Sequence, residues 1–227
     1  TDRSRTNLFL GTRTVRGRVM NIRYTLVAEG STDVALLPII NWALRADDRV
    51  REVEPQFVRP SELPSSSAGL AARIRRACAL YPANLMFVHR DSDRELPEVR
   101  RTEIRRAVEL VGEVTPSVPV VPVRTMEAWL LIDESAIREA ASNPGGKMTL
   151  GLPKVGGIER MADPKKVLYD SLRTAADLSG RRLKKFHVPT AAGLVADRVR
   201  DFSPLRQLVA YNEFEVLLRQ ALDRMAS

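Results

Sequence analysis

Short apolar runs alternate with helical patterns through the first half of the chain, and this alternation restricts the folds that it can adopt. The apolar runs predict strands over residues 23–28, 53–58, 83–89 and 118–123. Helical patterns fall over residues 31–45, 68–80 and 98–112, and another begins at residue 126. The apolar runs are mostly continuous, which is typical of parallel strands covered on both faces. The sequence therefore predicts an α/β fold with a mostly parallel four-stranded sheet and helices on both faces.

The last third of the chain has a different sequence pattern. Glycine and proline are frequent over residues 142–157, and helical patterns return over 164–176, 191–200 and 204–225. We expect a loop-rich segment and a C-terminal helical cap packed on the sheet. The predicted organisation is a basic N-terminal extension over 1–19, an α/β domain over 20–135 and the cap over 136–227.

Charge and cysteine content narrow the classes of function. The formal net charge is +8, which favours an anionic partner, with nucleic acid first. Half of the excess positive charge lies in residues 1–19. These residues precede Met20, where the sequence reads like a natural start, so we interpret them as an extension that need not be native. Cys78 is the single cysteine, so neither a disulfide framework nor a cysteine-based zinc site is expected. The chain has no apolar run long enough to span a membrane, and we expect a cytoplasmic protein.

Carboxylates follow three of the predicted strands. Glu29 follows the first strand, and Asp91 and Asp93 follow the third. Glu127 follows the fourth, and Asp33 lies one turn into the first helix. Because the carboxyl ends of parallel strands meet at one edge of a sheet, we expect these acids to converge. Clustered carboxylates repel each other and require cations, and their oxygen atoms suit Mg²⁺ or Mn²⁺.

The motifs that carry these acids resemble those of a known domain. EGSTD at residues 29–33 and DSD at 91–93 are similar to the Toprim domain of type IA and II topoisomerases, bacterial primases and OLD-family nucleases. The acid four residues after the glutamate is most similar to the OLD version. MEAWLLID at 126–133 and DPKKVLYD at 163–170 resemble small stand-alone bacterial Toprim-like proteins, which are often encoded beside an ATPase in mobile-element or anti-phage loci.

The resemblance implies a role for each matched acid. Glu29 would be a metal ligand or a general acid or base. Asp91 and Asp93 would hold Mg²⁺, and Asp33 would hold a second metal ion. Glu127 lies where the OLD version also places an acidic ligand. The simpler interpretations are that the DSD motif forms a polar turn and that Asp33 and Glu127 are favoured by the positive ends of helices.

The OLD version also implies a lysine later in the chain that stabilises the transition state. Lys147, Lys154 and Lys165 are the candidates, and Lys154 is the one that we assign as catalytic together with Glu29 and Asp91. The expected activity is two-metal hydrolysis of nucleic-acid phosphodiesters by the effector of a two-component bacterial defence or mobile-element system. The partners implied are nucleic acid and an ATPase, and a homodimer is left open.

Other functions of a Toprim domain fit less well. A topoisomerase would need a nucleophilic tyrosine on a breakage domain that the sequence does not show, and one cysteine cannot build the zinc ribbon of a primase. The alternative from another class is a non-catalytic Toprim-like protein that binds nucleic acid or the partner ATPase. A phosphatase or phosphotransferase acting on small molecules is a third candidate.

Several basic residues have two interpretations. Arg90 and Arg94 flank the acids and either pair with them or steer phosphate. The sequence RRLKKFH at 181–187 is either a solvated face or a phosphate contact, and its candidate contacts are Arg181, Arg182, Lys184 and Lys185. We expect His89, which lies just before the acidic pair, to have a structural role.

Overall fold

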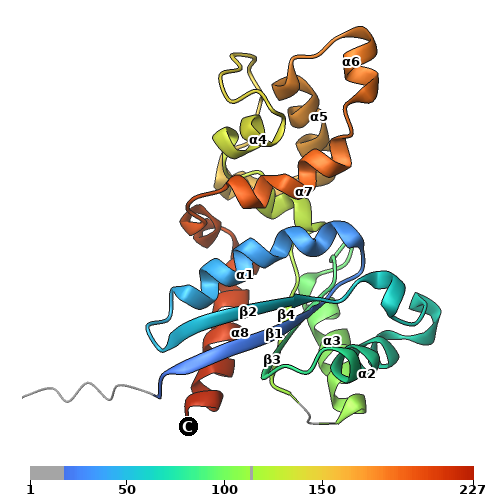
Figure 1. Ribbon diagram of the computed structural model, residues 1–227, viewed down its shortest axis with the longest axis vertical. Helices are drawn as coiled ribbons and strands as arrows, with labels where there is room; N and C mark the ends of the chain where they lie inside the picture. The colour runs from blue at the N-terminus through green and yellow to red at the C-terminus, as the bar shows by residue number, and fades with distance from the viewer. Residues whose placement is uncertain (1–17, 113–114) are drawn as a thin grey trace, which may run out of the picture.

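Four parallel strands form the sheet of the computed structural model, which describes residues 18–112 and 115–227 (Figure 1). The strands are β1 (Met20–Val27), β2 (Val50–Phe57), β3 (Leu85–His89) and β4 (Ser117–Val120). Their order is β2-β1-β3-β4, and every neighbouring pair is parallel. The predicted α/β fold with a four-stranded parallel sheet is therefore confirmed. Residues 1–17 of the predicted N-terminal extension lie outside the described residues.

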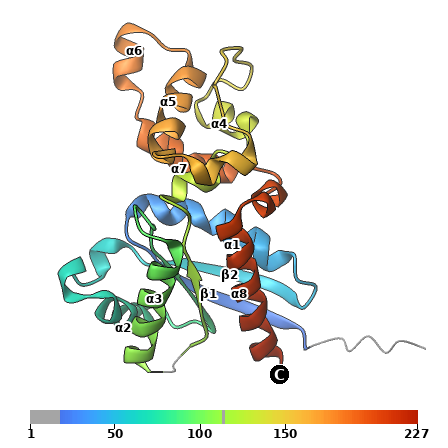
Figure 2. The same cartoon turned by 180° about the vertical axis from the view of Figure 1, so that it is seen from behind.

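Helices cover both faces of this sheet (Figures 1 and 2). One face carries α1 (Leu36–Arg45) and α8 (Val209–Ala226), and the other carries α2 (Leu70–Leu80) and α3 (Pro97–Val111). Side chains alternate between the two faces along each strand, so Phe87 joins the core under α1 and α8 while Met86 and Val88 join the core under α2 and α3. Every residue of β3 is buried for this reason.

The first helical pattern begins differently from the prediction. Residues Ser31–Ala35 form a 3₁₀ helix, and the α-helix starts only at Leu36. Pro38 explains the shift, because a proline deep inside an α-helix lacks an N–H donor and clashes with the carbonyl four residues earlier. Starting the α-helix at Leu36 places Pro38 in the first turn, where neither problem arises.

β4 lies at an edge of the sheet, where a strand can contain a proline. The N–H of Arg90 donates to the carbonyl of Val120 at 3.3 Å, so Val120 faces β3. Pro119, one residue earlier, therefore faces the open edge, where its missing N–H costs no ladder hydrogen bond. The strand ends at Val120, before Pro122.

The second half of the chain is helical. It contains α4 (Glu134–Ala140), α5 (Pro164–Ala176), α6 (Gly180–Lys185) and α7 (Val188–Arg198). α4, α5 and α7 contact one another, and α7 also contacts α1. α6 was expected only as a basic segment and is a short helix at the end of this layer farthest from the sheet (Figures 1 and 2). The described helices include none with the length and apolar content that a membrane span requires.

Short 3₁₀ segments connect the elements of the described part of the chain. Besides Ser31–Ala35 they are Pro60–Glu62, Ser66–Ala68, Met126–Leu130, Val155–Arg160 and Ser203–Gln207. The segment Met126–Leu130 carries the MEAW motif and is fully buried between the sheet and the helical layer.

An aromatic cluster joins α8 to the sheet and to the segment after β4. The ring of Phe214 on α8 lies 6.1 Å from Phe87 on β3 and 5.9 Å from Trp129, measured between ring centroids. Tyr211, one helical turn earlier, packs edge-on against Trp129 at 5.4 Å. The last helix is therefore part of the core of the sheet. The boundary at residues 135 and 136 stays a prediction.

Phe214→Ala tests this dependence. We expect it to reduce the free energy of unfolding by about 3–5 kcal/mol, because it leaves a cavity where three elements meet. Chemical denaturation followed by circular dichroism measures the loss. Val216→Ala on the exposed side of the same helix is the matched control and should cost less than about 0.5 kcal/mol. Equal, small losses for both variants would contradict the prediction.

Candidate functional site

The acids converge where β1, β3 and β4 end. The strand order reverses between β1 and β3, which creates a crevice at the carboxyl edge of an open parallel sheet. Glu29 and Asp33 enter from the loop after β1, and Asp91 enters from the loop after β3. Glu127 enters from the 3₁₀ segment after β4. The topology therefore places the acids in the region where α/β sheets form their sites.

Asp33 is held by the backbone of its own loop. Its Oδ2 accepts the N–H groups of Glu29 at 3.0 Å and of Gly30 at 2.8 Å. Burial raises the pKa of this carboxyl, and the neighbouring His89 acts in the opposite direction. The four-residue spacing of the EGSTD motif is thus the spacing that lets the aspartate close the turn after β1.

Asp91 connects all three strand ends. Its Oδ1 accepts the N–H of Met126 at 2.8 Å and lies 3.3 Å from Nε2 of His89. Its own N–H donates to Oε2 of Glu29 at 3.3 Å. This carboxylate therefore fixes the loop after β1 and the segment after β4 relative to the end of β3.

His89 lies at the centre of the cluster, with a fully buried side chain. Its Nδ1 lies 2.9 Å from the carbonyl oxygen of Val120, and its Nε2 faces Asp91 at 3.3 Å and Asp33 at 3.7 Å. Burial alone would lower the pKa of His89, but the carboxylates of Asp91 and Asp33 outweigh it, so the pKa is raised. Sequence reasoning gave this residue a structural role. The signal that could have found it is a polar side chain at the end of an otherwise apolar buried strand.

Glu127 is paired with Lys165. The Glu127 side chain is 4% exposed, and its Oε1 lies 3.1 Å from Nζ of Lys165. Asp163 accepts the N–H of Lys166 at 2.8 Å and caps α5, which places Lys165 in the first turn of that helix. Burial would lower the pKa of Lys165, but the charge of Glu127 prevails and the pKa is raised.

Of the three candidate lysines, Lys165 is the one that the structure brings to the acids. Lys154, which we assigned as catalytic, is exposed and precedes the 3₁₀ segment Val155–Arg160. Within the described residues, neither Lys154 nor Lys147 forms an ion pair. No ion pair between described residues joins Lys154 to the acids, so its assignment as catalytic stays a prediction. The sequence does not show which segment folds back onto the carboxyl edge of the sheet.

Asp93 does not join the cluster. Its side chain is 61% exposed and faces Arg100, with Oδ2 3.5 Å from Nη2. The residue has a left-handed backbone, with φ of 53°, and its N–H donates to the carbonyl of Arg124 at 2.9 Å. The expectation that Asp91 and Asp93 point with Glu29 toward one metal ion is therefore corrected. In the described part of the chain, no group of three His, Cys, Asp or Glu side chains is arranged to hold a metal ion.

Arg90 and Arg94, which flank the acids of the DSD motif, differ in their contacts. Arg90 pairs with Glu29 through Nε and with Glu103 at 2.5 Å through Nη1, so it neutralises an acid of the cluster. Arg94 is exposed and forms no ion pair with the described residues. It lines a hollow of about 490 Å³ next to the acids, together with Arg100, Arg124 and Thr125. Asp93, Glu95 and Asp163 line the same hollow, so its charges are mixed.

The basic residues of α6 are not part of this cluster. Arg181, Arg182, Lys184 and Lys185 are all exposed, and none forms an ion pair with another described residue. They lie at the end of the helical layer that is farthest from the sheet (Figures 1 and 2). Their contact with nucleic acid stays a prediction.

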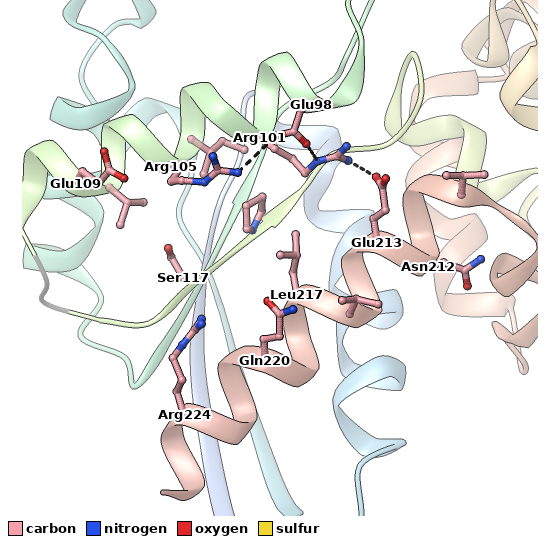
Figure 3. A pocket seen from close by; sticks show the side chains of 15 residues that line it. Glu98, Arg101, Arg105, Glu109, Ser117, Asn212, Glu213, Leu217, Gln220 and Arg224 are labelled. Atoms are coloured by element: carbon pink, nitrogen blue, oxygen red, sulfur yellow. Dashed lines mark hydrogen bonds and ion pairs between the residues drawn. The ribbon is translucent and has the colours of Figure 1, made fainter.

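A larger hollow in the described part of the chain lies away from these acids. It is a groove of about 990 Å³ between α3, the edge strand β4 and α8 (Figure 3). Ile104, Val108 and Leu217 give it an apolar lining, and Arg101 bridges Glu98 and Glu213 across one end. It contains none of the converging acids. We place the candidate site at the carboxyl edge of the sheet, because ionisable side chains from separate segments meet there.

Lys165→Met tests the pairing with Glu127. We expect the free energy of unfolding near neutral pH to fall by about 1–3 kcal/mol, because a buried carboxylate loses its partner. Thermal and urea unfolding measure the change, and Lys154→Met is the matched control, with an expected change below about 0.5 kcal/mol. Adding Glu127→Gln to Lys165→Met should restore part of the loss. No difference between the two lysine variants would refute the pairing.

Comparison of the chain with protein-family models, with curated proteins and with solved structures finds no match.

Proposed function

We propose that the chain is a metal-dependent hydrolase that cleaves phosphodiesters of nucleic acid at the sheet edge. The observation that carries the proposal is the convergence of Asp33, Asp91 and Glu127, from three separate segments, around buried His89 and the ammonium group of Lys165. Buried carboxylates of this kind cost stability unless they are matched by positive charge. A site that concentrates them at a crevice fits a functional role better than a structural one.

The residues present fit a divalent cation by their chemistry. Asp33, Asp91 and Glu127 offer carboxylate oxygens, and the buried Nε2 of His89 has no hydrogen-bond partner within the described residues. The three carboxylates would hold the ion, which would polarise a phosphoryl oxygen and activate a water when bound. The expectation of two ions stays a prediction.

The chain's own residues would handle the substrate. Lys165 is about half exposed, so its ammonium group can contact a phosphate while it remains close to Glu127. Positive charge fixed at this position stabilises the charge that develops on the phosphate during attack. Arg94 and Arg124 at the adjoining hollow can orient the neighbouring backbone phosphates. The net charge of +8 favours such a polyanionic substrate. The partner ATPase and the defence context rest on the Toprim resemblance.

A second candidate is a protein that binds nucleic acid or a partner without cleavage. It is favoured by the way in which Arg90 neutralises Glu29 and Lys165 neutralises Glu127. A cluster with these internal ion pairs needs fewer external cations than four free carboxylates would.

Metal-dependent cleavage decides between the two candidates. Plasmid, linear DNA, tRNA and mRNA are incubated with the full chain in Mg²⁺, Mn²⁺ or EDTA. We expect cleavage of one substrate class that stops in EDTA and falls by roughly 100-fold in Asp91→Asn, because the carboxylate that joins the strand ends is lost. The matched control is Asp48→Asn, an exposed aspartate beyond the far end of α1.

Cleavage that persists in EDTA, or that Asp91→Asn leaves intact, would refute the proposal. Binding of a nucleic acid without cleavage, in gel-shift experiments with either metal ion, would favour the second candidate.

A further inference from the structure

One polar atom at the sheet edge is not explained by packing or by hydrogen bonding. Nε2 of His89 belongs to a fully buried side chain and has no hydrogen-bond partner within the described residues. It faces two carboxylate oxygens, Oδ1 of Asp91 at 3.3 Å and Oδ2 of Asp33 at 3.7 Å. A buried polar atom without a well-formed hydrogen bond is costly, so this nitrogen is a candidate to bind a cation.

The second ring nitrogen, Nδ1, indicates which kind of partner Nε2 can take. Nδ1 lies 2.9 Å from the carbonyl oxygen of Val120, which can only accept a hydrogen bond. Nδ1 therefore carries a proton, and in the neutral ring Nε2 presents a lone pair. A lone pair that faces two carboxylate oxygens needs a cation between them. A proton on Nε2 can supply that charge, as the raised pKa of His89 indicates, and a metal ion can take the place of the proton.

This arrangement is the one that metal-binding histidines adopt. Such histidines donate the N–H of one ring nitrogen to a backbone carbonyl, which fixes the ring and leaves the other nitrogen free to bind the metal. Nitrogen and oxygen ligands about 2.1 Å from one ion lie roughly 3.0–3.5 Å apart. The separations of 3.3 Å and 3.7 Å about Nε2 are close to that range. The three donors do not surround one point in this structure. Binding therefore requires the side chains to move, and the oxygens of Asp33 and Asp91 that face Nε2 also accept backbone N–H groups.

We propose that His89 binds the metal ion through Nε2, together with Asp33 and Asp91, and that this nitrogen makes the site prefer a first-row transition ion such as Mn²⁺ over Mg²⁺. The inference deepens the proposed function and rests on it for the role of the ion. Mg²⁺ takes oxygen ligands almost entirely, whereas imidazole suits transition ions. The site is therefore different from one built of carboxylates alone.

Pulsed electron paramagnetic resonance of Mn²⁺ tests this directly. The full chain is prepared without a histidine tag, with ¹⁵N-labelled histidine, and is titrated with Mn²⁺. The chain has two histidines, and the second, exposed His187, is removed by His187→Gln as the matched control. We expect a ¹⁵N coupling to Mn²⁺ in the wild type and in His187→Gln, and its loss in His89→Gln. The signal in His187→Gln identifies His89 even when His89→Gln does not fold.

Competition with Mg²⁺ provides the second measurement. The excess of Mg²⁺ that displaces Mn²⁺ should fall about tenfold in His89→Gln relative to His187→Gln. Mn²⁺ binding without a histidine coupling would overturn the inference, and Mn²⁺-dependent cleavage under the same conditions would leave the proposed function standing. A histidine coupling without cleavage would support the inference and remove hydrolysis from the proposed function. Absence of Mn²⁺ binding at millimolar concentration would overturn both, and would leave a proton shared by His89 and the two aspartates as the cation.

Discussion

Three hydrogen bonds between the loop after β3 and the loop after β4 hold the candidate site together. The N–H of Asp93 donates to the carbonyl of Arg124 at 2.9 Å, and the N–H of Arg124 donates to Oγ of buried Ser92 at 2.7 Å. The N–H of Met126 donates to Asp91 at 2.8 Å. β4 is a short edge strand that contains a proline, so its own ladder gives little control over the path of the chain beyond Val120. The position of Glu127 depends on these contacts.

The same hydrogen bonds set the directions of the two aspartates in the DSD motif. In an extended chain, side chains two residues apart point the same way, as they would have to if Asp91 and Asp93 shared an ion. The left-handed backbone of Asp93, which a polar residue tolerates at moderate cost, breaks that rule. Its carboxylate faces Arg100, and Asp91 is left with His89 and Met126. The backbone conformation of Asp93 thus separates two aspartates that look equivalent in the sequence.

The sequence was most informative where local patterns decide the structure. Continuous apolar runs predicted the strands, their parallel direction and the edge to which Glu29, Asp91 and Glu127 belong, because burial on both faces leaves few alternatives. It was least informative where distant segments meet. Nothing local distinguishes Lys165 from Lys154, because the choice depends on how α5 folds back on the segment after β4. A polar side chain at the end of an apolar strand marks His89, but it does not show that the ring faces two acids, because Asp33 comes from the segment after another strand.

The packing of α8 on the sheet has a consequence for the order in which the chain can fold as it is made. Phe87 and Trp129 are both covered by Phe214, which emerges from the ribosome long after them. About 90 residues separate the end of β4 from the start of α8. At ordinary rates of synthesis, these residues take roughly 5–20 s to add. During that interval α1 can cover its part of this face, but the part around Phe87 and Trp129 lacks the helix that buries it in the finished protein.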